Sequence, residues 1–135
     1  MSGEREARLW FAQALADPDT ARDNAESHPD ASCFMAQQAA GKALKALEMA
    51  AAGGITHAHS LDVLYRRVKD LRVLSADLGR KAIRDLEQKN REARYPDMLI
   101  DTYPAAYFTA EDAREAIASG HEIVEAVRRD LPFDA

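Results

Sequence analysis

The spacing of apolar residues in CFMAQQAAGKALKALEMAAAGG, residues 33–54, constrains the fold more than any other feature. Apolar and small side chains recur at the three- and four-residue spacing of an α-helix. At about 100° per residue, the remaining positions gather on one arc of roughly 140°. They are Gln37, Gln38, Gly41, Lys42, Lys45 and Glu48. A helix that is apolar around so much of its circumference is typical of the centre of a bundle, where small residues permit close approach.

The other segments also indicate helices, because no run of β-branched residues alternates with period two. We expect five helical segments: residues 4–27, a segment from Asp30 or Ser32 to Gly53 and Gly54, a segment capped by Ser60, a longer one through Leu74 and Leu78 to about Arg94, and one that begins after Thr109. Thr109 and Asp112 have the spacing of a capping box. The sequence therefore predicts an all-α fold, an antiparallel up-and-down bundle of four to five helices in one domain, residues 1–135.

The first helix carries Leu9, Ala12 and Ala16 on one face and a proline in the sequence DPDT. A proline is tolerated at the first position of a helix. We therefore expect a break or kink here, with Asp17 capping a fresh helix that starts at Pro18.

Composition limits the class of protein. Hydrophobic residues make up 47% of the chain and charged residues 30%, which is typical of a soluble globular protein. No apolar run is long enough to span a bilayer, and the N-terminus lacks the apolar core of a signal peptide. The single cysteine, Cys33, excludes an internal disulfide and lies on the apolar arc, which favours an inert core thiol. We expect a cytoplasmic protein without membrane association.

Charge is unevenly distributed along the chain. Residues 66–94 contain ten basic and five acidic residues, while the net charge of the whole chain is −5. Such asymmetry is typical of a phosphate-binding surface or of a self-complementary pairing surface, although an ordinary exposed helix is an alternative.

Cofactor and metal motifs are weak. His57 and His59 form an HxH pair with only Asp62 nearby, which is too few ligands for a metal site. The chain has no glycine-rich phosphate loop. We therefore expect no metal and no cofactor.

Several segments together resemble the HEPN domain family. They are FMAQQAAGKALKALEMAAAGG, THAHSLDVL, ARYPD and YFTAEDAREAIASGHEIVEAVRRDL, in the family's order from about Ala7 to Leu131. The resemblance implies a helical bundle that commonly forms a homodimer and associates with nucleotides or RNA. It also implies pairing with a small nucleotidyltransferase, in systems of the toxin–antitoxin type. The chain departs from the family at Met35, where histidine is frequent, and at Gly41, where glutamate is frequent.

Ribonuclease members of the wider group carry an arginine, four to six residues, and a histidine that is often followed by x-Tyr. Arg22 with His28 and Arg114 with His121 have this spacing, but neither is followed by x-Tyr. If the chain cleaves RNA, the resemblance makes Arg114 the residue that stabilises phosphate charge and His121 the general acid or base, without a metal.

Three functions follow from these patterns. The first is a non-catalytic module that binds nucleotide or RNA, and the second is a ribonuclease that uses Arg114 and His121. The third is a protein-interaction bundle without a small ligand. The candidate nucleotide or phosphate ligands are Gln37, Gln38, Lys42, Lys45, His59, Lys81, Arg84 and Arg94. For Arg94 the alternative is a structural brace of the loop that starts at Tyr95, where Asp97 would accept hydrogen bonds from Arg94 or from nearby backbone.

Overall fold

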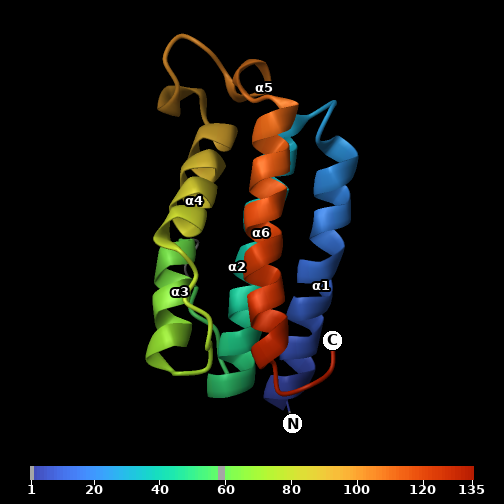
Figure 1. Cartoon of the computed structure of the whole chain (residues 1–135), viewed down its shortest axis with the longest axis vertical. Helices are drawn as coiled ribbons and strands as arrows, with labels where there is room; N and C mark the ends of the chain where they lie inside the picture. The colour runs from blue at the N-terminus through green and yellow to red at the C-terminus, as the bar shows by residue number, and fades with distance from the viewer. Residues whose placement is uncertain (1, 58–59) are drawn as a thin grey trace.

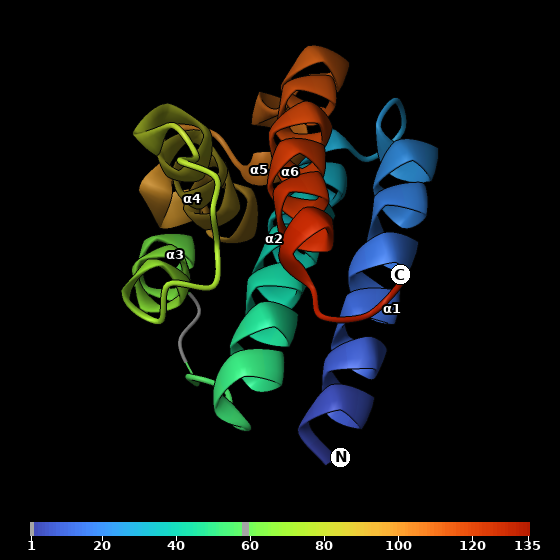
Figure 2. The same cartoon turned by 60° about the horizontal axis from the view of Figure 1, so that its bottom comes forward.

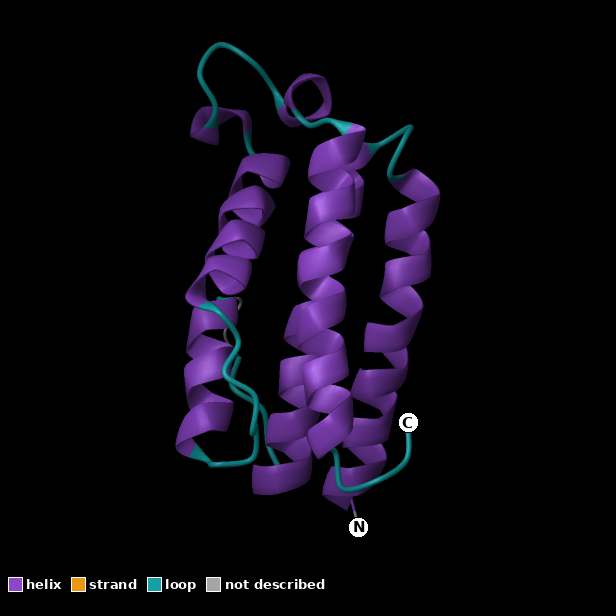
Figure 3. Cartoon of the chain, in the orientation of Figure 1, coloured by secondary structure: helices purple, strands orange, loops and turns teal. Residues whose placement is uncertain are grey.

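The computed structural model describes residues 2–57 and 60–135, which form helices joined by loops (Figures 1 and 3). The elements are α1 (Ser2–Asn24), α2 (Pro29–Ala52), α3 (Leu61–Asp70), α4 (Arg80–Arg94), the 3-10 turn η1 (Pro96–Met98), α5 (Pro104–Tyr107) and α6 (Ala110–Asp130). No strand occurs in these described ranges, so the predicted all-α bundle is confirmed. None of the described helices has both the length and the apolarity that crossing a membrane requires.

The four long helices alternate in direction, with α1 and α4 running one way and α2 and α6 the other (Figure 1). The short helix α3 lies below α4 on the same side of the bundle, as the turned view also shows (Figure 2). Helix α2 contacts every other α-helix. The Ala-rich sequence thus forms the centre of the bundle, as its pattern predicts.

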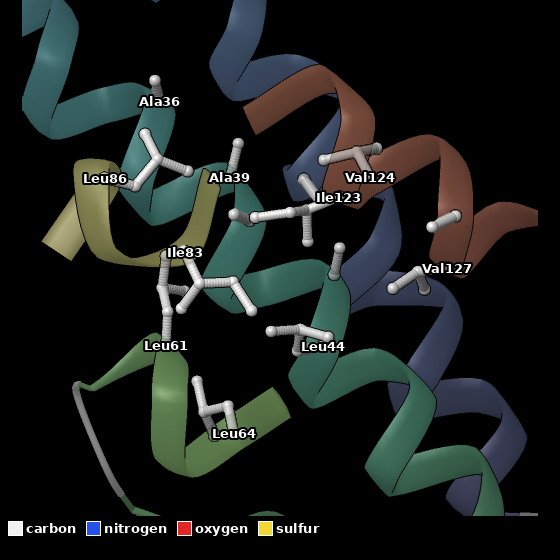
Figure 4. Packing of buried hydrophobic residues seen from close by; sticks show 14 of the residues in the cluster. Ala36, Ala39, Leu44, Leu61, Leu64, Ile83, Leu86, Ile123, Val124 and Val127 are labelled. Carbon is white, nitrogen blue, oxygen red and sulfur yellow. The ribbon is translucent and has the colours of Figure 1, made fainter. Parts of the chain in front are cut away.

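The core lies where α2 meets its neighbours. Ala36, Ala39 and Leu44 of α2 face side chains from α3, α4 and α6 (Figure 4). The contacting side chains labelled there are Leu61, Leu64, Ile83, Leu86, Ile123, Val124 and Val127. Each of these seven is at most 2% exposed, so apolar burial stabilises all of these helices against α2.

Gly120 permits the close approach of α6 to α2. A Cβ atom at this position would lie 2.9 Å from the carbonyl oxygen of Ala36. Only glycine allows the two backbones to approach this closely, because real Cβ atoms essentially never come so near to an oxygen.

Local helix signals in the sequence are confirmed. Gly53 ends α2 in the left-handed conformation, with φ of 73°, and Ser60 caps α3 by accepting a hydrogen bond from the Val63 N–H. Thr109 and Asp112 form a capping box at the start of α6. Tyr95 is extended and ends α4, as a residue before proline is expected to do.

The predicted break in the first helix is wrong. Helix α1 continues through Pro18 to Asn24, and Asp17 does not cap a new helix. Its carboxylate is instead 2% exposed and hydrogen-bonded to side chains of α1 and α2. The apolar face formed by Leu9, Ala12 and Ala16 is exposed, because α1 turns Phe11 and a row of alanines towards α2.

The predicted start of the fourth helix is also wrong. Helix α4 begins at Arg80, and Leu74 and Leu78 are buried in the preceding loop. Tertiary hydrogen bonds hold this loop in a non-helical path. Lys69 Nζ donates to the carbonyl oxygens of Leu74 and Ala76, and the Ser75 N–H donates to Asp130 at 2.8 Å.

Candidate functional site

A small cavity opens where α1, α2 and α3 meet, and it contains four of the predicted ligand residues. Its volume is about 190 Å³. It is lined by Trp10, Gln37, Gln38, Gly41, Lys42, Lys45 and Leu64. The helical spacing of α2 places its five members of this set on one face. The sequence pattern therefore identified one wall of the cavity, whereas Trp10 and Leu64 come from α1 and α3.

Lys42 is held by a buried carboxylate. Its Nζ lies 2.7 Å from Asp17 Oδ2, and Gln13 Nε2 donates to the other oxygen of the same carboxylate at 2.6 Å. Since the Asp17 side chain is 2% exposed, the Lys42 charge balances a negative charge inside the protein. Lys42 is thus a structural member of the cavity wall.

Lys45 is the cation of the cavity that has no ion pair among the described residues. Its Nζ lies 5.4 Å from the centre of the Trp10 ring, within the range of a cation–π interaction. Burial lowers the pKa of Lys45, and nearby Lys42 lowers it further while Glu48 opposes the shift. A partly desolvated ammonium group beside an indole ring attracts an anion more strongly than a fully hydrated lysine does.

The two glutamines belong to a chain of hydrogen bonds between helices. Gln38 Nε2 donates to Gln37 Oε1 at 2.9 Å, and Gln37 Nε2 donates to Glu87 Oε1 at 3.3 Å. Glu87 also accepts the Leu61 N–H at the start of α3. Gln37 is 2% exposed, so its side chain is buried between helices and is not solvated on the surface of α2.

Glu48, the last polar residue of the arc, is also buried and anchors the loop after α2. It accepts hydrogen bonds from the Thr56 N–H at 2.6 Å, from Thr56 Oγ1 at 2.8 Å and from Arg67 Nε at 2.9 Å. Burial opposes its ionisation, but these hydrogen bonds and the Arg67 charge lower the pKa of Glu48 below its ordinary value. Glu48 is therefore structural.

The cavity combines an aromatic wall, an ammonium group and a carboxamide. These groups suit a planar polar ring or an anion, and the volume suits a fragment of about the size of one nucleobase rather than a whole dinucleotide. Among the residues that the structure describes, no nucleophile with an adjacent base lines it. In the described part of the chain, no three His, Cys, Asp or Glu side chains are arranged to hold a metal ion.

The predicted catalytic pair faces a different groove. Arg114 and His121 line a space of about 520 Å³ between α1 and α6, together with Arg22 and Glu26. The Arg114 guanidinium lies 3.1 Å from Glu26 Oε1, so it already takes part in an exposed ion pair. His28, which follows Arg22 at the ribonuclease spacing, is not among the lining residues.

A third segment has all of the ribonuclease pattern except its histidine, and it was not predicted from the sequence. Arg94 is followed after six residues by Asp101, and Tyr103 lies two positions after Asp101. Asp101 therefore stands where the pattern has histidine, and it is exposed with φ of 52°. A carboxylate cannot donate a proton at neutral pH as an imidazolium does, so this segment does not supply the catalytic set.

The remaining predicted ligands do not gather in one place. Lys81 lines a groove between α4 and α6, whereas Arg84 faces the groove between α3 and α4. The Arg94 guanidinium lies 5.5 Å from the Phe34 ring centre and donates to Tyr95 Oη at 3.2 Å, which is the arrangement of a structural brace. Its partner is Tyr95 rather than the predicted Asp97. His59 lies outside the described residues.

Cys33 is fully buried, as its position on the apolar arc predicts. Burial raises the pKa of its thiol to about 12, an effect that nearby Lys89 opposes and nearby carboxylates reinforce. At neutral pH the thiol is protonated and unreactive.

The fold and the cavity define a small helical bundle with an Ala-rich central helix and a polar site on one side of it. The chain belongs to the HEPN domain family, whose model matches residues 7–130. No curated protein matches the sequence.

Two solved structures resemble the chain over nearly its whole length. TT1696 from Thermus thermophilus is 26% identical, with a TM-score of 0.78 over 97% of this chain and 100% of its own. ST0689, an archaeal HEPN homologue, is 25% identical, with a TM-score of 0.69 over 93% of this chain and 97% of its own. These similarities agree with the family assignment.

Proposed function

We propose that this HEPN domain is a non-catalytic module that binds a nucleotide, free or as part of an RNA, with its base in the cavity between α1, α2 and α3. One observation carries the proposal: Lys45 stands beside the Trp10 ring with no carboxylate paired to it in the described ranges. The ammonium group would attract phosphate, and the indole and the Gln38 carboxamide would contact the base.

The proposal includes assembly. We infer a cytoplasmic homodimer that docks a small nucleotidyltransferase, in a system of the toxin–antitoxin type. The family resemblance supports both associations, and the wide separation of positive and negative charge along the chain supports a charged docking surface.

Nucleotide binding is tested by equilibrium dialysis with AMP, ATP and a short single-stranded RNA at low salt. Changing Lys45 to Glu should weaken binding at least about tenfold, because a repulsive charge replaces an attractive one. Lys81→Glu is the matched control, since it makes the same charge change on an exposed residue outside the cavity. Binding that is absent from the wild type, or equal in the wild type and Lys45→Glu, would contradict the proposal.

A ribonuclease is the second candidate, because the α1–α6 groove brings Arg22, Arg114 and His121 together. In that case His121 would accept a proton from a ribose 2′-hydroxyl while the hydroxyl oxygen bonds to the adjacent phosphorus. The bond from phosphorus to the 5′-oxygen breaks, the leaving oxygen takes a proton from water, and the arginines would stabilise the charge on the phosphate. Incubation with single-stranded RNA in the presence of EDTA separates the two functions. We expect no cleavage, whereas cleavage that His121→Ala abolishes would replace our proposal with this one.

A further inference from the structure

The segment between α4 and α6 exposes an unusual amount of apolar surface. Residues 95–107, called the tip here, include η1 and α5 and cross one end of the bundle (Figure 1). Ile100 is 91% exposed, and three tyrosines are about half exposed: Tyr95 at 51%, Tyr103 at 60% and Tyr107 at 49%. Large apolar side chains gathered on one short exposed segment are typical of an interaction surface.

The tip is also acidic. Residues 95–113 contain no Lys, Arg or His, and Asp97 and Asp101 are exposed within the tip. This charge disfavours an RNA or an anionic membrane as the partner of the tip, because both would be repelled. The tip suits a partner surface that carries positive charge and side chains on which tyrosine rings can pack.

The groove between α3 and α4 of the same protein offers positive charge from exposed arginines and an aromatic side chain, Tyr65. Two adjoining cavities of about 420 and 160 Å³ share Asp62, Ile83 and Arg84. Arg91 and Glu87 also line the larger cavity, where Glu87 accepts the Leu61 N–H, and Arg66 and Tyr65 line the smaller one. Arg66 is paired with Asp62 at 3.0 Å. Arg84 and Arg91 make no ion pair with any residue that the structure describes, so their charges are available.

We propose that the tip of one protomer docks into the α3–α4 groove of a second copy, and that this contact forms twice across a twofold axis. The inference rests on the homodimer of the proposed function and gives that homodimer an interface. Asp97 and Asp101 face the arginines of the partner, and the tyrosines and Ile100 pack on the partner's Tyr65 and on the aliphatic stems of its arginines. Arginine also stacks well on tyrosine rings.

The positions of tip and groove on α4 agree with a twofold arrangement. The tip follows the C-terminal end of α4, about 16 Å along the helix from Arg84 at 1.5 Å per residue. Two α4 helices packed antiparallel therefore bring each tip beside the partner's groove. Parallel packing would place two acidic tips against each other, which like-charge repulsion opposes.

The exposed area is sufficient for a dimer. The four side chains expose about 500 Å² in one protomer, from their exposed fractions and a full area of about 150–250 Å² each. Two copies together present about 1,000 Å² from the tips alone, which is the lower limit for a specific interface. The walls of the two grooves add to this area.

A charge swap tests the contact by sedimentation velocity at micromolar concentration. The groove variant is Arg84→Glu with Arg91→Glu, and the tip variant is Asp97→Lys with Asp101→Asn, since asparagine also tolerates the positive φ at position 101. We expect the wild type to form a dimer of the 14.9 kDa chain and each variant alone to dimerise at least about tenfold more weakly. Mixing the two variants should restore a heterodimer, because each tip then meets a groove of opposite charge.

A second pair of variants keeps the test independent of the charge changes. Ile100→Ser should weaken dimerisation, whereas Leu9→Ser removes a large, 65% exposed apolar side chain from α1 and should not. Far-UV circular dichroism checks that every variant is folded.

Each result supports or overturns the inference. A wild-type monomer overturns both this inference and the homodimer of the proposed function. A wild-type dimer that the groove, tip and Ile100→Ser variants all retain, or variants that stay monomeric after mixing, overturn the interface alone. Nucleotide binding at Lys45 is measured separately, so its failure leaves the interface intact.

Discussion

The Lys42 ammonium lies 2.7 Å from a carboxylate oxygen of Asp17, which is 2% exposed and lies on α1, while Lys42 lies on α2. This ion pair joins α1 to the polar face of α2. It also explains why a charged residue precedes Pro18 inside a continuous helix: the Asp17 carboxylate is satisfied by Lys42 and Gln13 and does not need to cap a helix end.

Removing Lys42 should destabilise the protein. We expect Lys42→Met to lower the free energy of unfolding by about 2–3 kcal/mol, because it leaves the buried Asp17 charge with one neutral hydrogen-bond donor. The double variant Asp17→Asn with Lys42→Met should cost less than the sum of the single changes. Urea denaturation of the four proteins measures this coupling, and strictly additive effects would contradict it.

Glu48 should make stability depend on pH. Its pKa is lower in the folded protein than its ordinary value, so its ionised form stabilises the fold above pH 4.5, and this contribution is lost as the pH falls through the lowered pKa. We expect Glu48→Gln to cost about 1–3 kcal/mol at pH 7 and progressively less below pH 4.5. Urea unfolding of both proteins between pH 3 and pH 7 checks the sign. If the cost of Glu48→Gln grew as the pH falls, the result would contradict a lowered pKa of Glu48.

Two glycines in helices should respond in opposite ways to alanine. Gly120→Ala should lower stability by about 1–3 kcal/mol, because its Cβ would lie 2.9 Å from the Ala36 carbonyl oxygen and separate α6 from α2. Gly41→Ala should instead raise stability by about 0.5–1 kcal/mol, since its Cβ would make an ordinary contact of 3.6 Å with Leu61 and alanine favours the helix. Thermal unfolding of the two variants, compared with the wild type, provides the measurement.

Arg94 should act as a brace rather than as a ligand. We expect Arg94→Ala to lower the free energy of unfolding by about 1 kcal/mol, through loss of its contacts with the Phe34 and Tyr95 rings. The affinity for AMP should stay unchanged, because Arg94 does not line the α1–α2–α3 cavity. A variant with normal stability and weaker AMP binding would show the opposite role.

Local signals made most of the fold predictable from the sequence. The helical spacing of α2 identified the central helix, and Gly53, Ser60 and Thr109 marked helix ends because the groups that cap them lie within a few residues. Such signals need no knowledge of the tertiary structure.

Features set by distant residues were not predictable. Helix α1 has small or apolar residues on two faces, and only packing against α2 decides that Phe11 is buried and Leu9 is exposed. The loop before α4 is held by Asp130, which is 55 residues away from Ser75. The sequence pattern likewise predicted both Lys42 and Lys45 as ligands. In the structure Lys42 is paired with the carboxylate of Asp17, which lies on another helix.

Trp10 offers the most direct test of nucleotide binding, because it is the only tryptophan of the chain and lines the cavity. Its fluorescence can be followed while AMP or ATP is added at low salt. We predict a saturable change in emission that weakens as salt is added and is lost in Lys45→Glu, with Lys81→Glu behaving as the wild type. An emission that stays constant up to millimolar nucleotide, or that changes equally in Lys45→Glu, would contradict a nucleotide site in this cavity.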